Sequence, residues 1–246
     1  MKKKVALVLG GSGGIGFSAV ERLLSDGFIV CATYLTNKDK LKKISDGLDS
    51  TLIEVFQCDL SNVKNIHSLI KKISLLYGEI DVVTFSASSK LTNNRILNLE
   101  WDEYTNLFDL QVKPVFQVVK YLSKQLKAKH KTKFIILLTE YCVGSPPKGL
   151  SHYVTSKYAS MGLAKTMAVE LAEFNSTVNM ISPGMVETDF LDNLPAKLIE
   201  ITSLQNPLKR NASPQDISNA ISFLASNQSD YLNGENMIIN GGKVIH

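Results

Sequence analysis

The chain has 246 residues and a net charge of +4, with 44% hydrophobic and 20% charged residues. This composition is typical of globular proteins and excludes a disordered or collagen-like chain. The positive charge is mild and follows no stripe of basic and aromatic residues, so nucleic-acid binding is not indicated. At about 150 residues per domain, with α/β folds that reach roughly 250, the length predicts one domain over residues 1–246.

Cysteine usage and the lack of long apolar runs predict a cytoplasmic protein. Cys31, Cys58 and Cys142 form no CxxC pair, so neither a disulfide framework nor a zinc knuckle is expected. The apolar run after the N-terminal lysines, Val5–Leu9, is shorter than the roughly 7–15 residues of a secretory signal. No run approaches the roughly 18 apolar residues of a membrane span. The four histidines lack metal-ligand spacing, and we expect no metal site.

Short apolar runs alternate with longer amphipathic segments along the whole chain. The predicted strands are Val5–Leu9, Phe28–Tyr34, Thr51–Phe56, Asp81–Phe85, Phe134–Leu138, Thr177–Ile181 and Met237–Ile239. The predicted helices are Ile15–Ser25, Lys38–Ser45, Asn62–Tyr77, Asp102–Lys129, Tyr153–Phe174 and Pro214–Ser226. Nearly continuous apolar strands that alternate with helices are typical of a buried parallel sheet with right-handed crossovers. The predicted fold is therefore α/β: a doubly wound parallel seven-stranded sheet with helices on both faces, of the Rossmann type, in a single domain.

A glycine-rich loop follows the first predicted strand directly and leads into a helix. It reads Gly10-Gly11-Ser12-Gly13-Gly14-Ile15-Gly16. Glycines permit a tight turn and let backbone N–H groups approach a pyrophosphate at the helix N-terminus. A glycine-rich loop alone also occurs in ordinary strand-to-helix turns, but its position after a buried strand at the start of the chain favours dinucleotide binding.

A tyrosine and a lysine, Tyr153 and Lys157, lie four residues apart in a predicted helix and so share one face. A nearby ammonium group favours the phenolate, which suits a tyrosine that exchanges protons with a substrate. Such pairs are common by chance and are weak evidence by themselves.

The order of these elements resembles the short-chain dehydrogenase/reductase family over essentially the whole chain. The matching residues are Gly10, Gly14 and Gly16 of the glycine loop, Tyr153 and Lys157 of the Tyr-x-x-x-Lys motif, Pro183-Gly184, Gly241-Gly242, and Asp59 at the position of an adenine-contacting Asp. The stretch from Asn206 to Ser226 is most similar to 3-oxoacyl-carrier-protein reductases. The resemblance implies cofactor contacts from Gly10, Ser12, Gly13, Gly14, Ile15, Gly16, Tyr34, Asp59, Leu60, Ala87, Lys157, Pro183, Gly184, Val186 and Thr188, and a possible substrate lid at 187–206.

Two catalytic positions of the family pattern are substituted in this chain. The family's Ser, thirteen residues before the Tyr, falls on Glu140, and its helical Asn falls on Gln111. An ionised Glu140 cannot donate a hydrogen bond to a developing oxyanion, whereas a protonated one can. We expect Glu140 within hydrogen-bond reach of Tyr153, with Lys157 as its nearest cation. The hydroxyl of Thr139 is adjacent in sequence, but successive strand residues face opposite sides, so a local twist is needed to bring it to the site.

The resemblance implies an NADPH-dependent reductase of a ketone, such as a 3-oxoacyl thioester on a carrier protein or CoA, with Tyr153, Lys157, Glu140 and Gln111 as catalytic residues. NADP(H) is favoured over NAD(H) because Tyr34 replaces the acid that binds the ribose hydroxyls of NAD, and Thr36, Asn37 or Lys38 follow it. The alternative is a catalytically impaired member that acts as a nucleotide-binding partner subunit.

The resemblance also implies a dimer or tetramer, or a hetero-oligomer with a related subunit. Its contacts are expected on helices Asp102–Lys129 and Tyr153–Phe174 and on the last strand. Val115, Val118, Val119, Met161 and Met167 are the apolar residues expected to exceed what one sheet face can bury.

Overall fold

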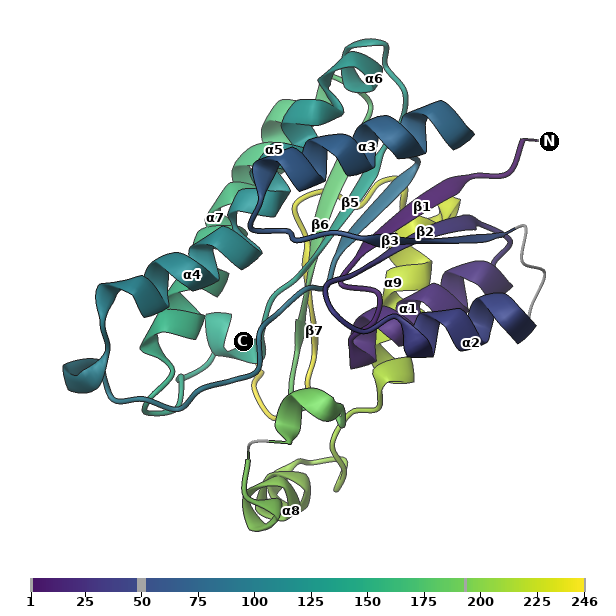
Figure 1. Cartoon of the computed structure of the whole chain (residues 1–246). Helices are drawn as coiled ribbons and strands as arrows, with labels where there is room; N and C mark the ends of the chain where they lie inside the picture. Colours follow the sequence, from purple (N-terminus) through teal and green to yellow (C-terminus); the bar gives the residue numbers. More distant parts are fainter. Residues whose placement is uncertain (1, 48–51, 193, 246) are drawn as a thin grey trace.

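Seven parallel strands form the centre of the molecule (Figure 1). The computed structural model describes residues 2–47, 52–192 and 194–245. The strands are β1 (Val5–Leu9), β2 (Ile29–Tyr34), β3 (Ile53–Gln57), β4 (Val82–Phe85), β5 (Lys133–Leu137), β6 (Thr177–Pro183) and β7 (Asn236–Ile239). Their order is β3-β2-β1-β4-β5-β6-β7, and every neighbouring pair is parallel. The predicted doubly wound sheet is confirmed.

Helices cover both faces of the sheet, as Figure 1 shows. They are α1 (Gly14–Ser25), α2 (Asp39–Gly47), α3 (Val63–Tyr77), α4 (Trp101–Gln111), α5 (Lys113–Tyr121), α6 (Ser123–Lys127), α7 (Ser151–Ala172), α8 (Ala196–Gln205) and α9 (Pro214–Ala225). The alternation of side chains along β1 explains the two layers. Leu7 packs in the core beneath α3, α5 and α7, whereas Val8 packs in the core beneath α1, α2 and α9.

The predicted long helix Asp102–Lys129 is wrong as a single element, because the structure divides it into α4, α5 and α6. Val112 separates α4 from α5, and Pro114 stands in the first turn of α5. Proline has no N–H for the carbonyl four residues earlier and its ring clashes with that carbonyl, so the helix cannot continue through it.

The segment 187–206, predicted to be less regular, contains a short 3₁₀ turn, Asp189–Leu191, and the helix α8. α8 has few buried residues to mark it, and its outer surface exposes Leu198, Ile201 and Leu204. The other predicted elements differ from the structure by a few residues at their ends, and Thr51, where the third strand was expected to begin, lies outside the described residues.

Three of the five apolar residues assigned to an oligomer interface lie in the core of the chain itself. Val115, Val118 and Met167 are buried beneath the sheet, so the expectation that they exceed what one sheet face can bury is wrong for them. Val119 and Met161 are partly buried against the same core. Within the described ranges, no helix combines the length and apolar character needed to cross a membrane.

Candidate functional site

A cavity of about 440 Å³ opens at the carboxyl ends of the strands, around β1 and β4. These two strands are neighbours in the sheet although β2 and β3 separate them in the chain, so the loops after them diverge to opposite faces. Ligands of open α/β sheets bind in the crevice that forms at such a point. The cavity is lined by all the residues predicted to contact a cofactor, together with Tyr153 and Glu140. Gln111 does not line it.

The glycine loop forms one end of this cavity in a conformation that excludes side chains. Gly10 has a φ of +85°, and a methyl group added to it would lie 2.6 Å from the backbone of Ala87. A methyl group on Gly16 would lie 2.1 Å from the carbonyl oxygen of Gly10, and one on Gly14 would lie 2.3 Å from Thr188 Cγ2. α1 begins at Gly14, so its free N–H groups and the positive end of its dipole face the cavity. The loop therefore fits the diphosphate of a dinucleotide.

The ends of β2 and β3 also border the cavity. Tyr34 lines the cavity, and no carboxylate of β2 stands beside it. Asp59 also lines the cavity, where its Oδ1 accepts hydrogen bonds from the backbone N–H and the hydroxyl of Ser61. Thr36, Asn37 and Lys38 are exposed and lie outside the cavity lining.

Tyr153 and Lys157 lie one turn apart on α7, with both side chains directed to the cavity. The Lys157 Nζ lies 5.7 Å from the centre of the Tyr153 ring and donates a 2.8 Å hydrogen bond to the carbonyl of Leu137. Burial lowers the pKa of the Lys157 ammonium to about 8. Burial raises the pKa of the Tyr153 phenol well above its ordinary value, and hydrogen bonding by the Thr139 side chain offsets part of that rise. The phenol therefore holds its proton at neutral pH.

Comparison with known proteins identifies the family. A protein-family model described as "Enoyl-(Acyl carrier protein) reductase" matches residues 10–243. The chain is 31% identical over 241 residues to the 3-oxoacyl-[acyl-carrier-protein] reductase FabG of Staphylococcus epidermidis, covering 97% of this chain and 98% of that protein. It is 30% identical over 244 residues to the FabG of Rickettsia typhi, covering 98% and 97%. The chain belongs to the short-chain dehydrogenase/reductase family.

A solved short-chain dehydrogenase/reductase from Serratia marcescens shares the fold, with a TM-score of 0.88 and 24% identity over 98% of this chain and 97% of that one. As a member of this family, the chain is an NAD(P)H-dependent oxidoreductase. Its glycine loop, Tyr153 and Lys157 all line the same cavity at the carboxyl ends of β1 and β4.

Glu140 is the principal departure from the family pattern, and its predicted pairing with Lys157 is wrong. The Glu140 Oε1 accepts a 2.8 Å hydrogen bond from Lys243 Nζ in the C-terminal turn. The other oxygen, Oε2, is buried without a hydrogen-bond partner in the structure. Among the described residues, no hydrogen bond joins Glu140 to Tyr153. The carboxylate turns toward the C-terminal turn because the first cation within its reach is there.

Thr139 lines the same cavity as Tyr153, and its hydroxyl offsets part of the rise in the pKa of the Tyr153 phenol. β5 ends at Leu137, and Thr139 has extended backbone angles and caps a 3₁₀ turn, Glu140–Cys142. Side chains alternate between the two faces only within a regular strand, and β5 has already ended before Thr139. Thr139 and Glu140 therefore both reach the cavity, although strand alternation would have placed only one of them there. The position of Thr139 next to Glu140 in the sequence was the signal that its hydroxyl could replace that of the family's Ser.

Gln111 is the last residue of α4 and is buried. Its amide nitrogen donates to Ser88 Oγ at 3.1 Å, and its amide oxygen accepts from Ser156 Oγ at 2.9 Å. Gln111 and Lys157 line a second cavity of about 10 Å³ together with Pro114. The remaining lining residues are apolar, among them Leu9, Phe85 and Ile136, so Gln111 and Lys157 are the two polar side chains that border this small cavity.

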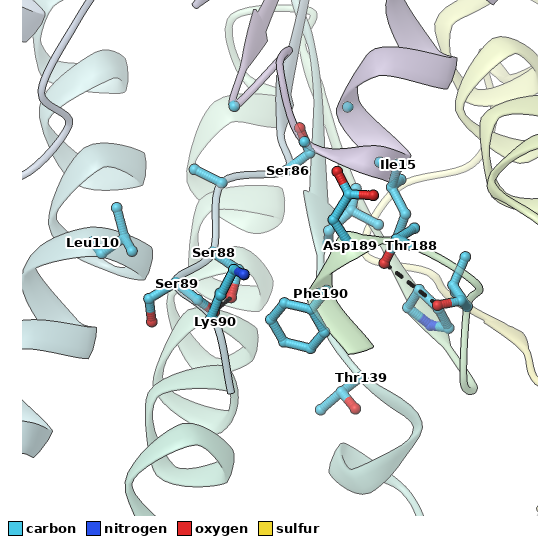
Figure 2. A pocket seen from close by; sticks show the side chains of 18 of the residues that line it. Ile15, Ser86, Ser88, Ser89, Lys90, Leu110, Thr139, Thr188, Asp189 and Phe190 are labelled. Carbon is cyan, nitrogen blue, oxygen red and sulfur yellow. Dashed lines mark hydrogen bonds between the residues drawn. The ribbon is translucent and has the colours of Figure 1, made fainter. Parts of the chain in front are cut away.

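Residues 188–191 and residues 86–90 after β4 line one side of the main cavity, and Figure 2 shows several of them. The Phe190 ring lies 6.3 Å, centre to centre, from that of Tyr153. Asp189 pairs with Lys40 of α2, whose charge and hydrogen bond hold the pKa of that carboxyl below its usual range. The lining residues that the sequence left unassigned include Ser86, Ser88, Ser89, Lys90, Thr139, Tyr141, Asp189 and Phe190. Most lie on loops without a motif; the sequence pointed only to Thr139, through its position beside Glu140, and to Asp189 and Phe190, through the possible lid at 187–206.

Proposed function

We propose that the protein is an NADPH-dependent reductase of a ketone, most specifically of a 3-oxoacyl thioester carried on a protein or on CoA. The names of the FabG relatives support this substrate class. The observation that carries the proposal is the buried, protonated phenol of Tyr153 at the wall of the cavity, with Lys157 beside it. A nicotinamide cofactor bound along the glycine loop would supply the hydride.

The chain's own residues supply the proton and hold the carbonyl. Tyr153 Oη donates its proton to the ketone oxygen as negative charge develops there, and its raised pKa keeps that proton available at neutral pH. Thr139 Oγ1 donates a hydrogen bond to the same oxygen, which is the role of the family's Ser. The Lys157 ammonium favours the phenolate left by the transfer. Gln111 acts through position: its hydrogen bonds to Ser88 and Ser156 hold the end of α4 against α7 beside this pair.

The assay that tests this function is oxidation of NADPH in the presence of a panel of 3-oxoacyl thioesters, followed by absorbance. Turnover that requires the thioester supports the proposal. The alternative, a nucleotide-binding subunit without catalysis, is supported if NADPH binds and no ketone in the panel is reduced. The segment 187–206 serves as the lid over the substrate, because Phe190 and Leu191 cover the cavity beside Tyr153.

We expect NADPH to bind more tightly than NADH, since Tyr34 supplies no carboxylate to repel a 2′-phosphate. Tyr34→Asp places a carboxylate where the ribose hydroxyls are bound. A charged hydrogen bond of this kind is worth about 1.5–3 kcal/mol, so the ratio of NADH to NADPH affinity should rise roughly tenfold or more. Calorimetric titration measures both affinities. Tyr34→Asn removes the ring without adding charge and is the control; an equal shift in this variant would contradict the assignment.

We also expect a homo-oligomer in solution. Apolar and aromatic side chains remain exposed on the helices of one layer: Trp101 on α4 is 73% exposed, Phe116 on α5 52% and Val169 on α7 79%. A second copy of the chain packed on these helices would remove such apolar side chains from water. Sedimentation velocity at micromolar concentration should give a dimer or tetramer, and Val169→Glu should shift it toward the monomer. A parent protein that sediments as a monomer would overturn this expectation.

Localisation to the cytoplasm remains a prediction, based on the three cysteines and their spacing in the sequence. Cys31, Cys58 and Cys142 are buried thiols outside any disulfide in the described structure. Burial raises the pKa of each thiol, so they do not act as reactive thiolates at neutral pH.

A further inference from the structure

The buried carboxylate of Glu140 lies at the junction between the wall of the cavity and the C-terminal turn. Its side chain is 3% exposed, whereas that of its partner Lys243 is 32% exposed. Lys243 is 103 residues away in the chain, so the 2.8 Å ion pair joins two segments that are distant in the sequence. A charge this deeply buried is costly without a partner, which makes the structure around Glu140 dependent on Lys243.

The ion pair is supported by close packing of the same two segments. A methyl group on Gly144 would lie 2.8 Å from Val244 Cγ2, so the loop after β5 and the C-terminal turn approach as closely as a glycine allows. On the cavity side, Gly184 lies against Glu140, since a methyl group on it would be 3.5 Å from Oε2. The Glu140 side chain is therefore held between the Pro183-Gly184 turn and the C-terminal turn.

The C-terminal turn, residues 240–244, also contacts the end of segment 187–206. Asn206, the residue after α8, donates its side-chain amide to the carbonyl of Asn240 at 2.8 Å. A methyl group on Gly241 would lie 2.4 Å from Asn206 Oδ1. A continuous path of contacts thus runs from Glu140 through Lys243 and the turn 240–244 to Asn206.

We propose that Glu140 is a positioning residue whose buried ion pair with Lys243 holds the C-terminal turn against the cavity wall and keeps the carboxylate away from Tyr153. Thr139, the preceding residue, then faces the phenol as the hydrogen-bond donor. This inference rests on the proposed function for its catalytic consequence, but the ion pair itself is testable without turnover. Glu140 is then a positioning residue and not the catalytic residue that the sequence predicted.

The test is a cycle of three variants: Glu140→Gln, Lys243→Met and the two together. The glutamine keeps an amide oxygen that accepts from Lys243, so Glu140→Gln should retain most of the parent's kcat. Lys243→Met leaves the carboxylate buried without its cation, and the resulting displacement of Thr139 should lower kcat about ten- to a hundredfold. In the double variant the neutral amide needs no cation, so kcat should recover most of that loss. Lys64→Met, at an exposed position on α3, is the control for loss of a lysine.

Two further readouts separate this inference from the proposed function. Thermal unfolding should show a lowered midpoint for Lys243→Met that the double variant restores. Hydrogen–deuterium exchange should rise in Lys243→Met at residues 139–144 and 240–245, and at 200–208. If the parent reduces no ketone, the proposed function fails, while these two measurements still decide the ion pair.

Two results would overturn the inference. A loss of about 10²–10⁴-fold in kcat for Glu140→Gln, with unchanged unfolding and exchange, would show that the carboxyl group itself takes part in proton transfer. Unchanged exchange and unfolding in Lys243→Met would show that the ion pair does not hold the turn.

Discussion

Tyr153→Phe is expected to lower kcat for ketone reduction by about 10²–10⁴-fold, which is the usual contribution of a positioned proton donor. The variant removes one oxygen and leaves the ring, which packs against Leu107, Leu150 and Val154. Removing a buried hydroxyl whose pKa is raised by burial creates no unpaired charge, so the fold should be unaffected. Stopped-flow or steady-state measurement of NADPH oxidation gives kcat, and calorimetry should give an unchanged NADPH affinity.

Tyr158→Phe is the matched control, because Tyr158 lies on the same helix and is 46% exposed. It should retain the kcat of the parent. If Tyr153→Phe also retains the kcat of the parent, Tyr153 does not donate the proton, and the proposed catalytic role of Tyr153 is wrong.

Gly16→Ala is expected to weaken NADPH binding by about ten- to a hundredfold. The added methyl carbon would lie 2.1 Å from the carbonyl oxygen of Gly10 and 2.7 Å from Ser86 Oγ. The nearer atom is backbone and cannot rotate away, so the loop must move; overpacking of this kind costs about 1–3 kcal/mol, which corresponds to that loss of affinity. Since the N-terminus of α1 moves with the loop, the loss should be seen for NADPH and NADH alike, by calorimetric titration.

Gly162→Ala serves as the control for a glycine inside a helix. No atom within 4 Å meets a methyl group at this position on α7, and alanine favours helix over glycine by roughly 0.5–1 kcal/mol. It should bind both cofactors as the parent does and unfold at an equal or higher temperature. Normal NADPH affinity in Gly16→Ala would mean that the loop does not form the diphosphate site.

The two positions where the sequence departs from the expected motif, Gln111 and Glu140, are both buried and both hydrogen-bonded. An amide at Gln111 keeps both its donor and its acceptor in use, through Ser88 and Ser156. The carboxylate of Glu140 pairs with the ammonium of Lys243. A buried amide or carboxylate is tolerated when the fold brings hydrogen-bond partners or an opposite charge to it.

Local patterns were sufficient to predict the layers of the fold and the two ends of the cavity. Apolar runs such as Val5–Leu9 are strands because both faces of a central parallel strand are covered, and all five residues of β1 are buried. The glycine loop and the Tyr153–Lys157 pair were predictable because each depends on backbone geometry over a few residues. A tight turn and a helical spacing of four are properties of the local chain.

The tertiary structure alone decided which polar group faces the phenol. Counting thirteen residues back from Tyr153 leads to Glu140, but the direction of its side chain depends on Lys243, 103 residues further along the chain. Likewise Thr139 faces the phenol because a 3₁₀ turn begins where β5 has ended, and that turn packs against the C-terminal turn. A buried charge turns to whichever partner the fold brings within a few ångströms, and spacing along the sequence contains no record of that distance.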